Sequence, residues 1–245
     1  MRVLGFDLET TGLDIANDRI LEIGAVIYDT DDKIPLSIFS HTIMPSNVEF
    51  REGYESPTGL KRANIIEFGR NLSTVFLELE CMIANCKPDA IVGHNIVGYD
   101  LPLTRHEAER EKAEIPLLLG LPVIDTRHDL PFKKEPSSRR QEHLAAEHGF
   151  LNPFPHRALF DVMTCLRLLS CYSFEEVFAM SKIPFVVMNA VVSYDDRQKA
   201  KDLRYSWEEA NSKRFPKKWV KAVRENAVDR EIEAAKAIGV TAVKI

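Results

Sequence analysis

The sequence has few cysteines and no long apolar segment, and both absences limit what the protein can be. Only 4 of its 245 residues are cysteine, with no CxxC pair and no histidine at zinc-site spacing. They predict reduced thiols in a cytoplasmic protein, not a disulfide framework or a structural zinc centre. No apolar run approaches the roughly 20 residues of a membrane-spanning helix. Two acids interrupt the apolar N-terminal stretch, so we expect no secretory signal there.

Charge is unevenly distributed along the chain. The net charge is −5 at pH 7, which alone argues weakly against a nucleic-acid partner. Residues 191–245, however, carry 13 Lys and Arg against 9 Asp and Glu, whereas residues 1–190 carry 19 against 28. Asymmetry of this kind is typical of a segment that contacts an anionic partner.

Hydrophobic periodicity predicts an α/β fold with a mixed sheet flanked by helices. Apolar runs at residues 2–8, 19–28 and 34–43 predict an antiparallel meander, and shorter runs at 89–93 and 121–125 predict two more buried strands. Helical periodicity covers residues 73–86, 101–114, 143–149, 157–170 and 229–238. Polar stretches near 51–60 and 126–142 read as loops. Three hairpin strands followed by alternating helices and strands indicate one sheet covered on both faces.

The chain divides by composition into a large domain and a small appendage. We expect the domain at residues 1–172, a linker at 173–190 around Pro184, and a small basic α+β module at 191–245.

Two acids stand at the end of the first expected strand. Asp7 and Glu9 are two residues apart, so their side chains point to the same face of that strand. Thr10, Thr11 and Gly12 follow as a small, flexible turn whose backbone N–H groups can approach a ligand closely. The pair is either a strand end entering solvent or the start of a metal site.

Three motifs follow one another in a recognisable order. FDLETTG carries Asp7 and Glu9, GHNIVGYDLPL carries Asp100, and HRALFD carries His156 and Asp161. Over residues 1–172 or so this series resembles the histidine subclass of the DEDD superfamily of 3′→5′ exonucleases, of the proofreading-subunit and exonuclease X type. The resemblance implies a ribonuclease H-like fold and metal-dependent phosphodiester hydrolysis.

Four converging carboxylates explain why such a site requires metal ions. Like charges in contact raise one another's pKa, so the cluster is tolerable only when cations neutralise it. Oxygen ligands suit Mg²⁺ or Mn²⁺, and two ions about 4 Å apart can hold the attacking and leaving oxygens of a phosphoryl displacement. By resemblance, Asp7, Glu9 and Asp161 would bind one ion, and Asp7 and Asp100 the second.

His156 would be the general base by the same resemblance. Inside one helix, His156 and Asp161 would lie about 140° apart and face different ways. Pro155 instead places His156 before the helix, where its imidazole can reach over the site. Histidine's ordinary pKa near 6.5 suits proton abstraction at neutral pH. The alternative is a histidine that merely flanks a helix start.

The same resemblance implies a set of substrate-binding residues. These are Thr10, Thr11, Gly12, Leu13, His94 and Asn95. The turn would hold the terminal nucleotide, with Leu13 as an apolar wedge against its base, although Leu13 could equally belong to the core. His94 and Asn95 would organise the second motif or cap the following helix.

The C-terminal module mixes cations with aromatic residues. Cations neutralise phosphates and aromatic rings stack on bases, so this pattern fits a single-strand-binding surface. The alternative is that Trp207 and Trp219 form the module's own small core and that the lysines are its solvated face. A polymerase or another protein of DNA metabolism is a candidate partner of this module.

The sequence thus predicts an exonuclease that removes nucleoside monophosphates from a single-stranded DNA 3′ end with two Mg²⁺ or Mn²⁺ ions. An RNA-trimming exoribonuclease, or a catalytically silent nucleic-acid-binding or polymerase-associated module, remains the alternative. No residue separates ribose from deoxyribose, so DNA is preferred on the resemblance alone.

Overall fold

The first strand is the centre of the larger sheet. β1 (Arg2–Thr10) is flanked by the antiparallel β2 (Ile20–Asp29) and the parallel β4 (Ala90–Gly93). A computed structural model describes residues 1–46, 58–208 and 218–245. Most of the expected polar loop at 51–60 therefore lies outside the described residues, as do Lys213, Arg214, Phe215 and Lys217 of the C-terminal module.

Five strands form this sheet in the order β3-β2-β1-β4-β5. β3 (Ile34–Thr42) is antiparallel to β2, and β5 (Val123–Asp125) is parallel to β4. The predicted meander and the two short buried strands are therefore confirmed. The order places the C-terminal ends of β1, β4 and β5 side by side at one edge of the sheet, where acids follow the apolar runs.

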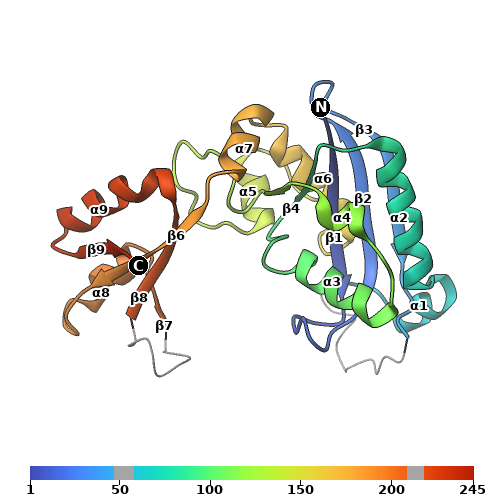
Figure 1. Cartoon of the computed structure of the whole chain (residues 1–245), viewed down its shortest axis with the longest axis horizontal. Helices are drawn as coiled ribbons and strands as arrows, with labels where there is room; N and C mark the ends of the chain where they lie inside the picture. Colours follow the sequence, from blue (N-terminus) through green and yellow to red (C-terminus); the bar gives the residue numbers. More distant parts are fainter. Residues whose placement is uncertain (47–57, 209–217) are drawn as a thin grey trace. The chain divides into compact units, whose positions relative to one another are not determined.

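Alternate residues of β1 face two different cores. Leu4, Phe6 and Leu8 pack with α2 (Leu72–Cys86), whereas Val3 packs with α6 (Ala158–Leu169). Figure 1 shows α2 on one side of the sheet and α6 on the other. By the two-residue period of a strand, Asp7 and Glu9 point to the α6 side.

Glycines bring α6 close to the sheet. A Cβ at Gly24 of β2 would lie 2.5 Å from the backbone of Ala158 and Leu159, and a Cβ at Gly5 would lie 2.7 Å from Val162 Cγ1. Gly24 pairs with Asp7 across the β1–β2 ladder. The first turn of α6 can therefore approach the acidic end of β1 only because no side chain separates them.

Shorter helices complete the first unit. They are α1 (Arg62–Phe68), α3 (Asp100–Glu111), α4 (Pro116–Gly120), α5 (Gln141–Glu147) and α7 (Phe174–Ser181). α3 and α5 were predicted, whereas α1, α4 and α7 were not. α4 has only 5 residues, and α7 falls in the expected linker. No helix in the described part of the chain is both long enough and apolar enough to cross a membrane.

The chain divides into two compact units, residues 1–181 and 182–245. The expected linker at 173–190 instead holds α7 and nearly all of the next strand. Phe174 and Val177 of α7 are buried in the core of the first unit. Pro184 and the small polar residues of this segment favoured a linker over two short elements.

The second unit has a four-stranded antiparallel sheet in the order β7-β8-β6-β9. Its elements are β6 (Phe185–Val191), α8 (Arg197–Asp202), β7 (Ser206–Glu208), β8 (Lys218–Arg224), a 3₁₀ turn (Glu225–Ala227), α9 (Val228–Ala237) and β9 (Thr241–Lys244). This β-α-β-β-α-β order is a split βαβ arrangement. Both helices pack through Ala200 and Ala235 on one core, and they lie on the same side of the strands in Figure 1.

Candidate active site

Asp7 and Glu9 end the buried part of β1 and open the site. Glu9 is buried and Asp7 half-buried. The neighbouring acid on β2, Glu22, pairs with Glu9 across the ladder. It accepts hydrogen bonds from Arg157 Nη2 at 2.7 Å and from the Ala158 N–H at 2.9 Å. Glu22 is thus a satisfied structural acid that ties the start of α6 to β2.

Asp161 lies in the first turn of α6, directly beyond this tether. Its Oδ1 accepts from Asn152 Nδ2 at 2.6 Å, and its Oδ2 accepts from the His156 backbone N–H at 3.0 Å. His156 has a φ of 62°, a left-handed conformation that few side chains other than Asn, Asp and His adopt readily. This turn aims the His156 N–H at the carboxylate and leaves the imidazole partly exposed.

Glu9, His156 and Asp161 converge. One potential ligand atom from each lies within 4.8 Å of the other two, a spacing that could hold a metal ion. Glu9 and Asp161 are buried, whereas His156 is exposed. His156 precedes α6, which begins at Ala158, and its imidazole lies beside Glu9 and Asp161, as its position after Pro155 led us to expect.

Asp100 is the first residue of α3 and is buried. The turn before it is anchored by Asp125 at the end of β5, whose Oδ1 accepts the Asn95 N–H at 2.8 Å. Both ring nitrogens of His94 are hydrogen-bonded within the protein. Nδ1 lies 3.0 Å from Thr126 Oγ1, and Nε2 lies 2.9 Å from the Arg139 carbonyl oxygen. The alternative in which His94 or Asn95 caps the helix is wrong, because α3 begins after Tyr99.

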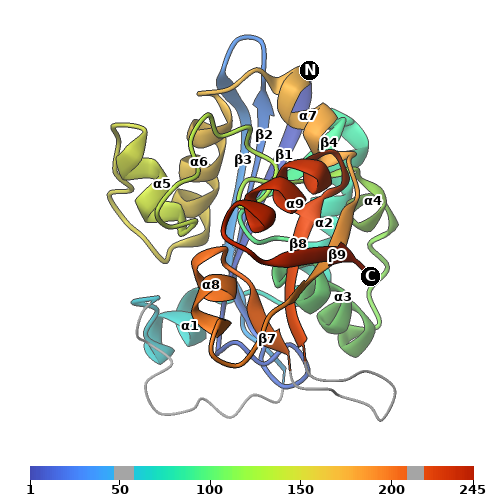
Figure 2. The ribbon, with the colours of Figure 1, turned by 90° about the vertical axis from the view of Figure 1, so that its left-hand side faces the viewer.

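One cavity of about 780 Å³ collects most of the predicted residues. Its lining includes Asp7, Glu9, Leu13, His94, Asn95, Asp100, His156 and Asp161. It also includes Arg127, Arg140, Gln141 and Glu142, from the loop after β5 and the start of α5. Thr10, Thr11 and Gly12 do not line it. Figure 2 shows α5 beside α6, the helix that carries Asp161.

Thr10, Thr11 and Gly12 form the turn behind the cavity wall. Tyr99 Oη lies 2.7 Å from Thr10 Oγ1 and donates to the Gly12 carbonyl. Thr11 Oγ1 donates to Asp18 Oδ1 at 2.8 Å. Leu13 follows the turn and is 85% exposed, so the alternative that placed it in the core is wrong.

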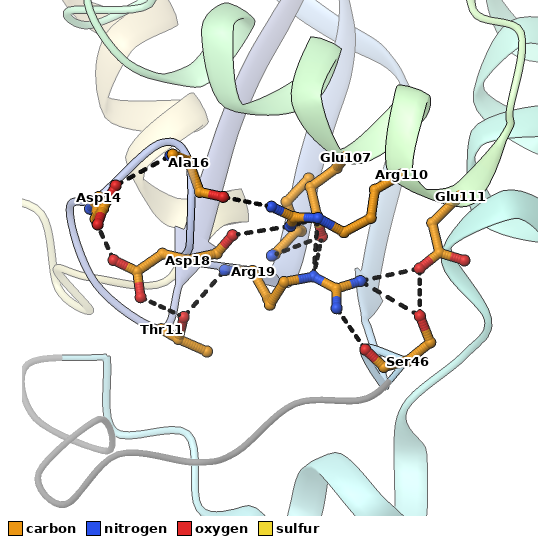
Figure 3. A network of polar contacts seen from close by, with 10 residues as sticks. Thr11, Asp14, Ala16, Asp18, Arg19, Ser46, Glu107, Arg110 and Glu111 are labelled. Atoms are coloured by element: carbon orange, nitrogen blue, oxygen red, sulfur yellow. Dashed lines mark hydrogen bonds and ion pairs between the residues drawn. The ribbon is translucent and has the colours of Figure 1, made fainter.

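A polar network holds the whole loop after β1 against α3 (Figure 3). Arg19 Nε donates to the buried Glu107 at 2.8 Å, and its Nη2 donates to Glu111 at 2.9 Å. Arg110 bridges back to the loop, donating to the Ala16 carbonyl at 2.7 Å and to Glu107. Because α3 also carries Asp100, this network fixes the first and second motifs relative to each other.

The four carboxylates have strongly perturbed acidities. Burial, followed by the neighbouring acids, raises the pKa of Asp7 well above its usual range and that of Glu9 to about 8. Burial also raises the pKa of Asp100 to about 7 and that of Asp161 to about 6. Full ionisation near neutral pH therefore requires a compensating charge. A donor set of carboxylate oxygens with one imidazole nitrogen fits a divalent cation.

Several residues of the site were not predicted. Tyr99 links the first and second motifs through its hydroxyl, and Asn152 and Gln141 hydrogen-bond Asp161. Only adjacency to Asp100 pointed to Tyr99. Arg127, Arg140, Gln141 and Glu142 all fall within residues 126–142, whose polar composition predicted a loop and gave no periodic signal.

Sequence comparison supplies the family. The model of the RNase_T family, described as exonuclease, matches residues 4–169. The chain belongs to this exonuclease family. Its recognition as a DEDDh-type 3′→5′ exonuclease with a ribonuclease H-like fold is confirmed. Among curated proteins, no sequence matches the chain significantly.

Solved structures share this fold at low sequence identity. E. coli exonuclease I in complex with a dT13 oligonucleotide matches with a TM-score of 0.62 and 15% identity, over 91% of this chain and 63% of that chain. The zinc-bound E. coli exonuclease I–ssDNA complex matches at 0.67 and 17%, over 97% and 67%. The nuclease domain of 3′hExo bound to rAMP, a DEDDh family member, matches at 0.60 and 14%, over 69% and 90%. The chain thus spans less than two thirds of exonuclease I in the dT13 complex.

Proposed function

We propose that the protein hydrolyses phosphodiester bonds at single-stranded DNA 3′ ends and releases nucleoside 5′-monophosphates. The observation that carries this proposal is the convergence of Asp7, Glu9, Asp100 and Asp161 with His156 on one cavity. A module that only bound nucleic acid would gain nothing from four mutually repelling carboxylates. The preference for single-stranded DNA draws on the exonuclease I–oligonucleotide complexes.

Each residue has a role in this proposal. Asp7, Glu9 and Asp161 would hold one Mg²⁺ or Mn²⁺ ion, and Asp7 with Asp100 a second. When bound, the two ions supply positive charge to the attacking and leaving oxygens. His156 takes the proton from the attacking water at its unprotonated imidazole nitrogen. Leu13 packs against the base of the terminal nucleotide, with His94 and Asn95 beside it. Thr10, Thr11 and Gly12, which do not line the cavity, form the turn that places Leu13 there.

RNA is the second candidate substrate. The 3′hExo nuclease domain, whose structure contains rAMP, shares the fold over 90% of its own length. DNA and RNA therefore have to be compared directly.

The test is the shortening of end-labelled oligonucleotides. Matched 5′- and 3′-labelled DNA and RNA strands are incubated with Mg²⁺, Mn²⁺ or EDTA. We expect stepwise shortening from the 3′ end that requires metal and is lost in Asp7→Ala. Intact strands in the presence of either metal, with binding retained, would refute the enzyme; faster trimming of RNA would reassign the substrate.

We propose a supporting role for the second unit. One exonuclease I structure is a complex of ExoI with SSB-Ct, and residues 191–245 of this chain carry a net positive charge. The rings of Trp207 on β7 and Trp219 on β8 pack edge to face with their centroids 5.3 Å apart, and Trp207 is 47% exposed. This surface would bind nucleic acid or a polymerase or another protein of DNA replication or repair.

The free state of all four cysteines fits a reducing cytoplasm.

A further inference from the structure

Two arginines on the cavity wall make no side-chain hydrogen bond or ion pair in the described part of the protein. Arg127 and Arg140 line the same cavity as the four carboxylates, and both are exposed. Their neighbours differ: Arg157 is paired with Glu22, and Arg139 with Glu135.

The backbone around both arginines is nevertheless firmly held. The Arg127 N–H donates to Asp125 Oδ1 at 3.0 Å, and its carbonyl accepts from Arg139 Nη1 at 2.7 Å. Arg140 precedes Gln141, whose Nε2 donates to the Asp161 carbonyl at 2.7 Å. The backbone that carries each arginine is therefore held close to a motif residue. For Arg127 this residue is Asn95, whose N–H shares Asp125 Oδ1 with the Arg127 N–H. For Arg140 it is Asp161, through the neighbouring Gln141.

The two arginines and the carboxylates reach the cavity from different elements. The arginines face the cavity from the loop after β5 and the start of α5, whereas the acids project from β1, α3 and α6.

This arrangement suits an anion that is not the scissile phosphate. A guanidinium offers a planar fork of N–H donors that matches phosphate oxygens. A nucleic-acid strand with its 3′ end at the carboxylates must continue through the cavity mouth, with its next phosphates on the wall.

We propose that Arg127 and Arg140 bind the phosphodiester groups immediately upstream of the scissile bond. The inference rests on the proposed exonuclease function and adds a backbone-binding subsite to it. The two positive charges attract the phosphates of the strand in a cavity that is otherwise acidic. Because a single nucleotide has no upstream phosphodiester group, the pair selects polynucleotides.

The test compares a polynucleotide with a substrate that lacks upstream phosphates. Wild type, Arg127→Gln, Arg140→Gln and the double variant are assayed on a single-stranded oligonucleotide and on the p-nitrophenyl ester of thymidine 5′-monophosphate. Loss of one charged hydrogen-bonding group costs about 10- to 100-fold. We expect each variant to lose at least tenfold more kcat/KM on the oligonucleotide than on the ester. Lys134→Gln, an exposed cation of the same loop outside the cavity, is the matched control and should change neither.

Binding provides a readout that does not depend on catalysis. Oligonucleotide affinity is measured by fluorescence anisotropy in EDTA over a range of salt concentrations. Each lost phosphate contact should reduce the log–log salt slope by about 0.7. A methylphosphonate at the upstream linkage should weaken binding by wild type but add nothing to the loss in the double variant.

The outcomes separate the two proposals. If wild type binds but hydrolyses neither substrate, the exonuclease function fails, while reduced slopes in the variants would still support the subsite. Equal losses on both substrates, or unchanged affinity and salt slope in the double variant, would overturn the subsite. Wild-type folding of each variant is checked by its melting temperature.

Discussion

Among the four carboxylates, Asp7 has acidic neighbours on every side. Asp100, Asp161, Glu9 and Glu22 all add to the effect of burial on its pKa. These groups come from β2, α3 and α6 as well as from its own strand. This central position supports its proposed role as the bridging metal ligand and makes it the residue whose loss should matter most.

Asp7→Asn should separate activity from stability. Losing the proposed bridging ligand would remove several kcal/mol of transition-state stabilisation, so we expect hydrolysis to fall by about 10³-fold or more. The metal-free variant should melt at a higher temperature than wild type, because a neutral amide replaces a carboxyl group whose ionisation burial and the neighbouring acids oppose. Calorimetry in EDTA and an oligonucleotide assay measure both, with the exposed Asp32→Asn as control. An active variant would contradict the bridging role.

At the level of residues, the sequence predicts the side chains whose chemical type the proposed reaction requires, namely the acids and the histidine. Asp7, Glu9, Asp100, His156 and Asp161 fall in ordered motifs, and the structure places them on one cavity. Arg127 and Arg140 could not be predicted, because any of the five basic residues in the 126–142 loop could have faced the cavity. Only tertiary contacts decide which side chains point inward.

At the level of elements, two contacts determine the geometry of the site: the seat of α6 on β1 and β2, and the attachment of the loop after β1 to α3. Neither contact is encoded by periodicity. The first depends on Gly24, and the second on Glu107, which the helical pattern would assign to a solvated face although it is buried.

Gly24→Ala should push α6 away from the sheet. Its Cβ would lie 2.5 Å from backbone atoms that cannot rotate aside. Overpacking of this kind costs about 1–3 kcal/mol, and the displaced Asp161 should lower kcat about tenfold or more. Urea unfolding and steady-state assays measure the two effects. Gly120→Ala, where a Cβ would meet nothing within 4 Å, is the control; identical behaviour of the two variants would refute this account of α6.

Glu107→Gln should loosen the loop that carries Leu13. The substitution leaves Arg19 buried with a weakened partner, and breaking a buried ion pair from one side costs about 3–5 kcal/mol. We expect a lower melting temperature and faster amide exchange at residues 14–19. The exposed Glu109→Gln on the same helix should change neither. Unaltered exchange in Glu107→Gln would show that the network does not hold the loop.

At the level of the whole molecule, metal-free stability should fall with rising pH. The folded pKa values of about 6, 7 and 8 for Asp161, Asp100 and Glu9 exceed the usual values near 4 for unfolded carboxylates. Between about pH 4 and 8 the folded state therefore binds more protons than the unfolded state, so raising the pH favours unfolding.

This pH dependence is measured as the melting temperature in EDTA from pH 5 to 8. We expect a steady decrease that saturating Mg²⁺ largely removes, since bound cations replace the protons. The slope should be shallower in Asp7→Asn. A melting temperature that rises over this range would show that the carboxylates are already ionised in the metal-free protein.

His156 contributes more than an imidazole. Its backbone N–H fixes Asp161 Oδ2, and it can do so because the residue adopts a left-handed conformation. Alanine adopts that conformation less readily, so His156→Ala would disturb Asp161, a proposed metal ligand, as well as remove the proposed base. Asparagine tolerates it, and we expect His156→Asn to lose hydrolysis while retaining Mn²⁺ affinity by calorimetric titration. Substitution by alanine would thus overstate the contribution of the His156 imidazole to catalysis, because part of the lost activity would come from the displaced Asp161.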